Sequence, residues 1–64
     1  MDKIKTNSKE VKIGDTFIAL KGFKEDGHKY IEDAIKNGAT KIICEYGDYN
    51  IDTVIVPNTK DYLN

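Results

Sequence analysis

The sequence has few residues that could cross-link the chain or bind a metal. Its 64 residues include one cysteine, one histidine, one proline and no tryptophan. A single cysteine forms no internal disulfide, and one thiol with one imidazole falls short of the four ligands of a structural zinc site. We therefore predict no metal site, a reduced, cytoplasmic setting, and a fold stabilised by packing alone.

Arginine and an excess of either charge are also missing. All ten cationic residues are lysines, and 11 acidic residues bring the net charge to −1. A surface for nucleic acid or an anionic membrane needs a basic excess, so neither partner is expected. Without guanidinium groups, any phosphate contact must use lysine or backbone N–H groups. The apolar runs are far shorter than the roughly 20 residues of a membrane span.

Short apolar runs separated by polar turns make up most of what is present. Residues 16–20, 41–44 and 53–56 are segments of strand length, each a run of consecutive apolar residues after its first residue. Such runs are typical of strands that are covered on both faces, as in a parallel sheet. Residues 3–6 alternate between polar and apolar side chains and predict a weak edge strand.

One full helix is predicted over residues 28–37, where apolar side chains recur at helical spacing. Asp26 or Gly27 is the expected N-cap, and Gly38 suits the left-handed position after the helix. Thr59 is the expected N-cap of a second helix, of which the sequence contains about one turn.

Strand, helix, strand, strand and the start of a helix is the order of an α/β domain with a small, mainly parallel sheet. We predict one domain over residues 1–64, truncated at its C-terminus. Open α/β sheets bind ligands beyond the carboxyl ends of their strands, so the loop Lys21–His28 is the expected ligand site.

A phosphate-binding loop is one interpretation of this segment that the spacing does not support. Gly22 to Lys29 superficially resembles a P-loop, but the lysine falls one residue late. Tyr30 also stands where a P-loop has the Ser or Thr that holds magnesium. A dinucleotide fingerprint is absent as well, so neither motif is predicted.

Five other side chains allow both a structural and a functional interpretation. His28 is either an acid–base group or a packed residue of the first helical turn, and we favour packing. Cys44 is expected to be a small buried hydrophobe rather than a reactive thiol. Tyr46 and Tyr49 are expected to fold over the sheet edge rather than stack on a ligand. Ser8 is either a turn residue or a hydrogen-bonding partner for a polar ring or sugar.

Several fixed spacings together resemble a known family. The sequence runs Ser8-Lys-Glu-Val-Lys-Ile-Gly-Asp-Thr-Phe-Ile-Ala-Leu-Lys-Gly22, then Asp26-Gly-His-Lys-Tyr-Ile31, then Ala34 to Ala39. It is similar to the Mur ligase N-terminal pattern D-S-R-x-V-x-x-G-D-x-F-x-A-x-x-G, D-G-x-x-[FY]-[IV] and A-x-x-x-G-A. The likeness covers Asn7 to Ala39, is nearest to the MurE type, and extends to the later segment TVIVPNTK.

The resemblance implies a substrate-binding role without chemistry of its own. In this family the N-terminal domain holds the uridine diphosphate end of UDP-N-acetylmuramoyl-L-alanyl-D-glutamate. A central ATPase domain uses ATP and Mg²⁺ to phosphorylate the substrate, and a C-terminal domain presents the amino acid, diaminopimelate or lysine. The sequence has none of the motifs of those two domains, so no catalytic residue and no cofactor are expected in this chain.

The resemblance also assigns the binding residues. Ser8 matches a uridine contact, the loop after Gly22 would border uracil and ribose, and the Asp-Gly pair shapes this loop. The implied substrate-binding set is Ser8, Phe23, Lys24, Glu25, Asp26 and Gly27. Asn7 and Lys9 replace the family's Asp and Arg, which removes a planar donor fork. The balanced charge keeps an alternative open, namely a small α/β interaction or structural domain without a nucleotide ligand.

Overall fold

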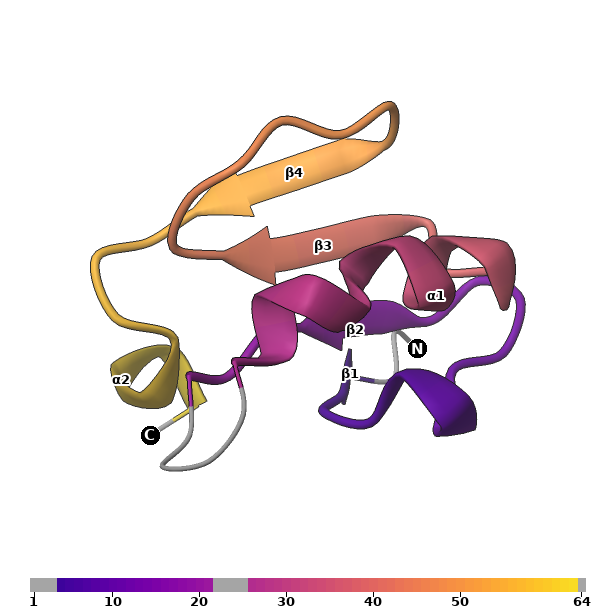
Figure 1. Ribbon diagram of the computed structural model, residues 1–64, viewed down its shortest axis with the longest axis horizontal. Helices are drawn as coiled ribbons and strands as arrows, with labels where there is room; N and C mark the ends of the chain where they lie inside the picture. Colours follow the sequence, from indigo (N-terminus) through magenta and orange to yellow (C-terminus); the bar gives the residue numbers. More distant parts are fainter. Residues whose placement is uncertain (1–3, 22–25, 64) are drawn as a thin grey trace.

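A four-stranded parallel sheet forms the centre of the molecule. The computed structural model describes residues 4–21 and 26–63. Its strands are β1 (Ile4–Lys5), β2 (Thr16–Ile18), β3 (Lys41–Cys44) and β4 (Asp52–Ile55), in the spatial order β1-β2-β3-β4 (Figure 1). Every neighbouring pair is parallel. The predicted α/β class and parallel sheet are confirmed.

Three strands differ slightly from their predicted bounds; β1 ends at Lys5 rather than at residue 6, and β4 ends at Ile55 rather than at residue 56. β2 ends at Ile18 rather than at residue 20, although the Ala19 N–H still donates to Ile43 O at 2.9 Å. β4 begins one residue earlier than predicted, because Asp52 pairs with Lys41 at the start of β3. Apolar runs therefore locate each strand well, while the ladder between strands sets its ends.

The predicted helix consists of two segments. A 3₁₀ turn, η2 (Gly27–Tyr30), leads into α1 (Ile31–Lys36). Asp26 is the N-cap, since its side chain accepts a hydrogen bond from the His28 N–H at 3.0 Å. Gly38 has φ of 115°, the left-handed conformation expected after the helix.

Two further helical segments flank the sheet. The 3₁₀ helix η1 (Ser8–Glu10) was not predicted, and Asn7 caps it by accepting from the Lys9 N–H at 3.0 Å. α2 (Thr59–Leu63) follows β4. The prediction of Thr59 as its N-cap is wrong, because Asn58 Oδ1 accepts from the N–H of Lys60 at 2.9 Å. Thr59 is instead fully buried.

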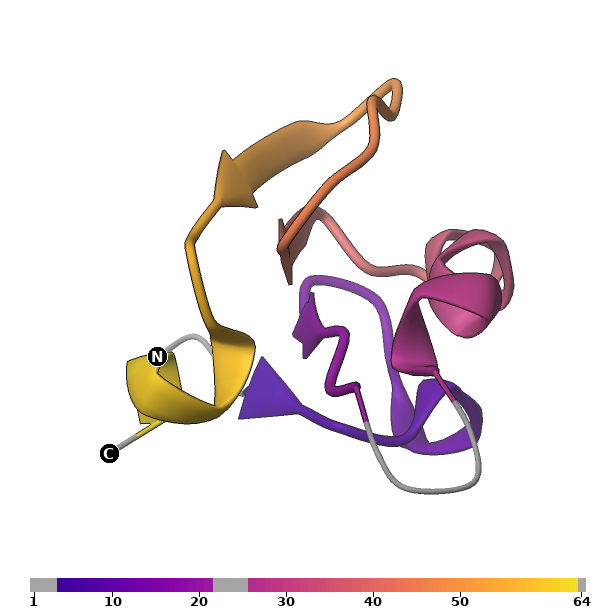
Figure 2. The ribbon, with the colours of Figure 1, turned by 60° about the vertical axis from the view of Figure 1, so that its left-hand side comes forward.

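The main core lies between α1 and one face of the sheet. Phe17 and Ile42 point from the central strands toward Ile31 and Ala34 of the helix, and all four are buried. Ile18 and Ile43 alternate with them and are also buried on the opposite face. α1 and α2 lie on opposite sides of the central strands in Figure 2.

The connection between β3 and β4 has no helix, although parallel strands are usually joined by one. Residues 45–51 return along the sheet as an irregular segment (Figure 1). Tyr49 and Ile51 of this segment pack partly buried against the core, which confirms the structural interpretation of Tyr49. The connection thereby covers apolar surface that a helix would otherwise cover.

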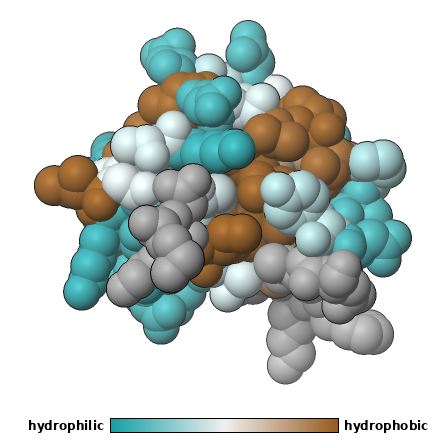
Figure 3. Space-filling model, turned by 180° about the vertical axis from the view of Figure 1, so that it is seen from behind, coloured by the Kyte–Doolittle hydropathy of each residue, from teal (hydrophilic) through white to brown (hydrophobic). Residues whose placement is uncertain are grey.

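The outer surfaces are mixed in character. Seen from behind, apolar side chains are interspersed with polar ones (Figure 3). Ile13, Ile55 and Tyr62 are among the exposed large apolar residues. Within the described ranges, no helix has the length and apolar character needed to cross a membrane.

Candidate functional site

A pocket of about 610 Å³ opens at the carboxyl end of β2. This volume lies in the range of roughly 300–1,000 Å³ typical of small-molecule sites. Its lining residues are Thr6, Asn7, Ser8, Lys9, Leu20, Lys21, Gly27, Tyr30 and Lys60. The position agrees with the rule that parallel α/β sheets bind ligands beyond their strand ends.

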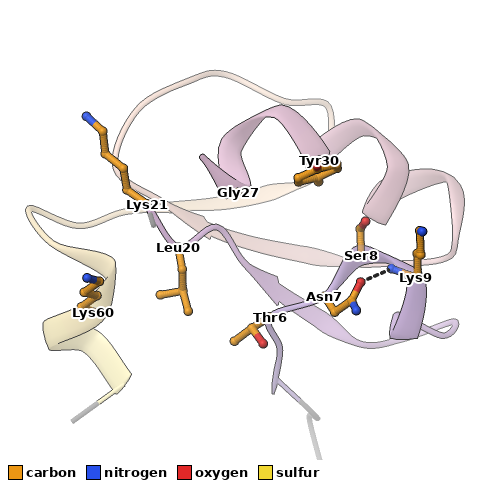
Figure 4. Close-up of a pocket in the computed structure, with 9 residues that line it drawn as sticks. All are labelled: Thr6, Asn7, Ser8, Lys9, Leu20, Lys21, Gly27, Tyr30 and Lys60. Atoms are coloured by element: carbon orange, nitrogen blue, oxygen red, sulfur yellow. Dashed lines mark hydrogen bonds between the residues drawn. The ribbon is translucent and has the colours of Figure 1, made fainter. Parts of the chain in front are cut away.

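Three segments that are distant in sequence form the walls of this pocket (Figure 4). Residues 6–9 form the η1 wall, which carries a hydroxyl and an amide side chain. Residues 20, 21 and 27 form the β2 wall, where the chain leaves the strand and enters η2. Lys60 of α2 lies opposite the η1 wall and completes the enclosure.

The pocket is lined by cations without matching carboxylates. Lys9, Lys21 and Lys60 each come from a different wall, and no Asp or Glu among the described residues lines the pocket. The chain as a whole has a net charge of −1, so the described lining of the pocket is more cationic than the chain as a whole. Such a concave cationic surface favours an anionic ligand.

Gly27 allows the β2 wall to close tightly. Its N–H donates to Leu20 O at 2.7 Å, and Lys21 and Asp26 form an antiparallel bridge beside it. A Cβ atom at residue 27 would lie 2.7 Å from Leu20 O and 2.8 Å from Leu20 N. Only glycine therefore allows the two backbone segments to approach this closely.

A hydrogen-bonded cluster of Asp26, His28 and Tyr46 supports the β2 wall from outside. Asp26 Oδ1 lies 2.6 Å from His28 Nδ1, and Asp26 Oδ2 accepts from the Tyr46 hydroxyl at 2.8 Å. The His28 N–H, the Tyr46 hydroxyl and the His28 ring together lower the pKa of Asp26 to about 2. The same carboxylate raises the pKa of Tyr46, first because it accepts a hydrogen bond that only the protonated hydroxyl can donate, and further because it would repel a phenolate.

Both ring nitrogens of His28 are occupied. The Glu45 N–H donates to His28 Nε2 at 2.9 Å. A backbone N–H can only donate, so Nε2 is unprotonated and the ring proton lies on Nδ1, facing Asp26. The imidazole is 7% exposed and stacks on the Tyr46 ring, with centroids 4.1 Å apart. His28 is therefore a packed structural residue rather than a general base, as the sequence predicted.

Cys44 is likewise structural. It is buried at the end of β3 among the core residues, and burial raises the pKa of its thiol. A buried thiol with a raised pKa holds little thiolate at neutral pH and reacts slowly. The sequence interpretation of Cys44 as a small hydrophobe is thus confirmed.

The structure places some of the predicted binding residues in the pocket and others outside it. Ser8 and Gly27 both line the pocket, on the η1 and β2 walls respectively. Asp26 lies at the base of the β2 wall with its carboxylate directed at His28 and Tyr46; its direct contact with a ligand stays a prediction. Phe23, Lys24 and Glu25 lie outside the described residues.

Sequence reasoning missed four residues of the pocket, Lys60, Tyr30, Leu20 and Thr6. A usable signal existed for Lys60. The carboxyl ends of parallel strands meet at one edge of a sheet, and Lys60 follows β4 just as Lys21 follows β2. Residues within a few positions after each predicted strand could therefore have been grouped as candidates.

The parallel sheet, with a pocket beyond the carboxyl end of β2, defines the chain as an α/β domain. Comparison with known sequences then gives the family: residues 1–62 match the Mur ligase family, catalytic domain. The chain belongs to the Mur ligase family.

Relatives with two different substrate types resemble the chain. It is 47% identical over 45 residues to the UDP-N-acetylmuramoyl-L-alanyl-D-glutamate–2,6-diaminopimelate ligase of Clostridium botulinum, covering 70% of this chain and 9% of that protein. It is 57% identical over 42 residues to the UDP-N-acetylmuramoyl-tripeptide–D-alanyl-D-alanine ligase of Rickettsia prowazekii, covering 66% of this chain and 9% of that protein.

A solved structure supports the same family. The MurF ligase from Thermotoga maritima, crystallised with ADP, superimposes with a TM-score of 0.87 at 43% identity. The match covers 97% of this chain and 15% of that one. The chain thus spans only about a tenth of its relatives' length, 9% to 15% in these three cases. Because both ligase types match, the shared property is the family rather than one substrate specificity.

Proposed function

We propose that the pocket binds the uridine diphosphate end of a UDP-N-acetylmuramoyl peptide, as the substrate-recognition part of a Mur ligase in peptidoglycan synthesis. One observation carries this proposal. The pocket combines lysines on all three walls with a hydroxyl- and amide-bearing wall, and no described carboxylate lines it. A diphosphate needs the cations, and a uridine needs the polar wall.

The different chemistry of the three walls supports the same ligand. Ser8, Asn7 and Thr6 on the η1 wall offer hydrogen-bonding groups for a sugar or pyrimidine ring. Lys60 and Lys21 on the other two walls supply the charge for phosphate oxygens. The UDP end is common to the substrates named for both types of relative, so a UDP site accounts for the resemblance to both.

For the finer substrate we propose the dipeptide precursor UDP-N-acetylmuramoyl-L-alanyl-D-glutamate, which the names of the diaminopimelate ligases contain. The parent enzyme would then add diaminopimelate or lysine in the cytoplasm. ATP and Mg²⁺ do not fit this chain's own residues. Residues 22–29 lack P-loop spacing, and no group of three or more His, Cys, Asp or Glu suited to a metal occurs among the described residues. ATP would therefore belong to the central domain of the parent ligase, and no chemical step is assigned to this chain.

Titration with UDP, uridine and the full precursor, followed by amide NMR shifts and calorimetry, tests the proposal. We expect shifts to cluster at Ser8, Gly27 and Lys60, and uridine to bind more weakly than UDP. Lys60→Gln should weaken UDP binding about two- to fivefold, the usual scale of a partly exposed ion contact. Lys36→Gln is the matched control, because it removes the same charge from the exposed face of α1.

Three results would argue against UDP binding. They are an absence of saturable shifts, shifts confined to residues outside the pocket, and equal losses in the Lys60 and Lys36 variants. Any of them would favour the alternative of an interaction domain without a nucleotide ligand.

A further inference from the structure

Two adjacent residues outside the pocket connect to two of its walls. Glu45 and Tyr46 directly follow β3, and neither lines the pocket. Their side chains and one backbone N–H make hydrogen bonds to η2 and α2, which are distant in sequence. These bonds link the residues that follow β3 to the segments that form the β2 and α2 walls.

Tyr46 holds the β2 wall through Asp26. Its hydroxyl donates to Asp26 Oδ2 at 2.8 Å while its ring stacks on His28 at an interplanar angle of 5°. Asp26 precedes Gly27, whose N–H closes onto Leu20. Fixing the Asp26 carboxylate therefore fixes the backbone that forms this wall. Tyr46 is 52% exposed, so burial in the core does not explain its contacts.

Glu45 holds the α2 wall through Thr59. Its Oε2 accepts from the Thr59 N–H at 3.0 Å and lies 3.3 Å from the Thr59 hydroxyl, which donates to it. Thr59 is buried and precedes Lys60, the cation of this wall. The backbone N–H of the same glutamate donates to His28 Nε2, so Glu45 also contacts the support of the β2 wall.

We propose that Glu45 and Tyr46 are positioning residues, which set the separation and orientation of the β2 and α2 walls for the anionic ligand. The inference rests on the proposed function for its ligand, UDP. Small displacements matter in such a site, because a charge-assisted contact depends on its distance and angle. Neither residue lines the pocket; each acts through the residue before a lining residue, Asp26 before Gly27 and Thr59 before Lys60.

Variants that remove one bond at a time test this role. Tyr46→Phe keeps the stacked ring and loses the hydroxyl bond to Asp26. Glu45→Ala loses both bonds to Thr59, while Glu45→Gln keeps an oxygen that accepts from the Thr59 N–H. Tyr62→Phe and Asp48→Ala are matched controls, because each alters an exposed side chain that is not among the residues lining the pocket.

We expect Tyr46→Phe and Glu45→Ala each to raise the Kd for UDP about fivefold, equivalent to ~1 kcal/mol. Glu45→Gln should restore most of the affinity, and both controls should bind within about twofold of the unmodified chain. In the free chain, Tyr46→Phe should shift the Gly27 amide signal, and Glu45→Ala should shift that of Lys60. A general loss of stability would instead speed amide exchange equally in β3, including at Ile42 and Ile43.

The outcomes separate this inference from the UDP proposal. If the unmodified chain binds no UDP, the proposed function fails, but the amide signals still report on the walls without ligand. Unchanged signals at Gly27 and Lys60 would then overturn the positioning role. If the chain binds UDP and both variants bind it as tightly as the controls do, the positioning role is wrong while the proposed function stands.

Discussion

Replacing Gly27 by alanine should destabilise the chain through a steric clash between two backbone segments. The added Cβ would lie 2.7 Å from Leu20 O, about 0.7 Å closer than the 3.4 Å at which ordinary contact begins. The neighbouring atoms are backbone, so no side-chain rotation relieves the clash. Leu20 and residue 27 must separate, which also weakens the 2.7 Å hydrogen bond between them.

The magnitude follows from three contributions. Overpacking costs about 1–3 kcal/mol, and loss of the hydrogen bond to Leu20 costs about 1 kcal/mol. Alanine restricts the unfolded chain more than glycine does, and this effect offsets about 0.4–1 kcal/mol of the loss in the free energy of unfolding. The net loss in the free energy of unfolding is about 2 kcal/mol, or roughly 8–16 °C in Tm for a domain of this size.

Thermal unfolding by circular dichroism, with amide spectra of the folded chain, measures this effect. Gly14→Ala is the control, because its φ of 92° disfavours alanine while a Cβ there meets no atom within 4 Å. We expect Gly14→Ala to lower Tm without affecting the pocket, and Gly27→Ala to lower it further and to shift the Leu20 and Lys21 signals. An unchanged Tm for Gly27→Ala, or unmoved signals at Leu20, would refute the steric argument.

Two further predictions concern titration and thiol chemistry. The folded-state pKa of Asp26, about 2, lies below its usual 3.8, so the folded chain binds fewer protons there than the unfolded chain does. Its stabilising contribution is therefore complete above about pH 4 and is lost as the pH falls toward 2. Asp26→Asn should make the midpoint of urea unfolding depend less on pH over that range. Cys44 is buried with a raised pKa, so a thiol-specific disulfide reagent should modify it at least about a hundredfold faster in the unfolded than in the native chain; similar rates would contradict the packing described here.

The features that the sequence predicted well are those determined by residues close together in the sequence. Apolar runs and helical spacing located the strands and α1, and short-range chemistry identified Asp26 and Gly38 as helix ends. Asn58 and Thr59 show where this reasoning stops, because both side chains can cap a helix. The choice between them depends on Glu45, which binds Thr59 and leaves the capping role to Asn58.

The candidate site was predictable only where a local sequence motif contains its residues. Ser8 and Gly27 were assigned by resemblance to a family motif, and both line the pocket. Lys60 contributes only because α2 folds back beside β2, and Tyr46 reaches Asp26 across a separation of 20 residues. No local pattern encodes these approaches, since they depend on how the strands are ordered in the sheet.

That order has a consequence for synthesis of the chain on the ribosome. Strands β1, β2, β3 and β4 are neighbours in space in the sequence in which they are translated, so each new strand finds its partner already made. The pocket is completed later than the sheet, because its last wall depends on Lys60, which is translated after all four strands. A nascent chain should therefore form its sheet first and complete the pocket only later.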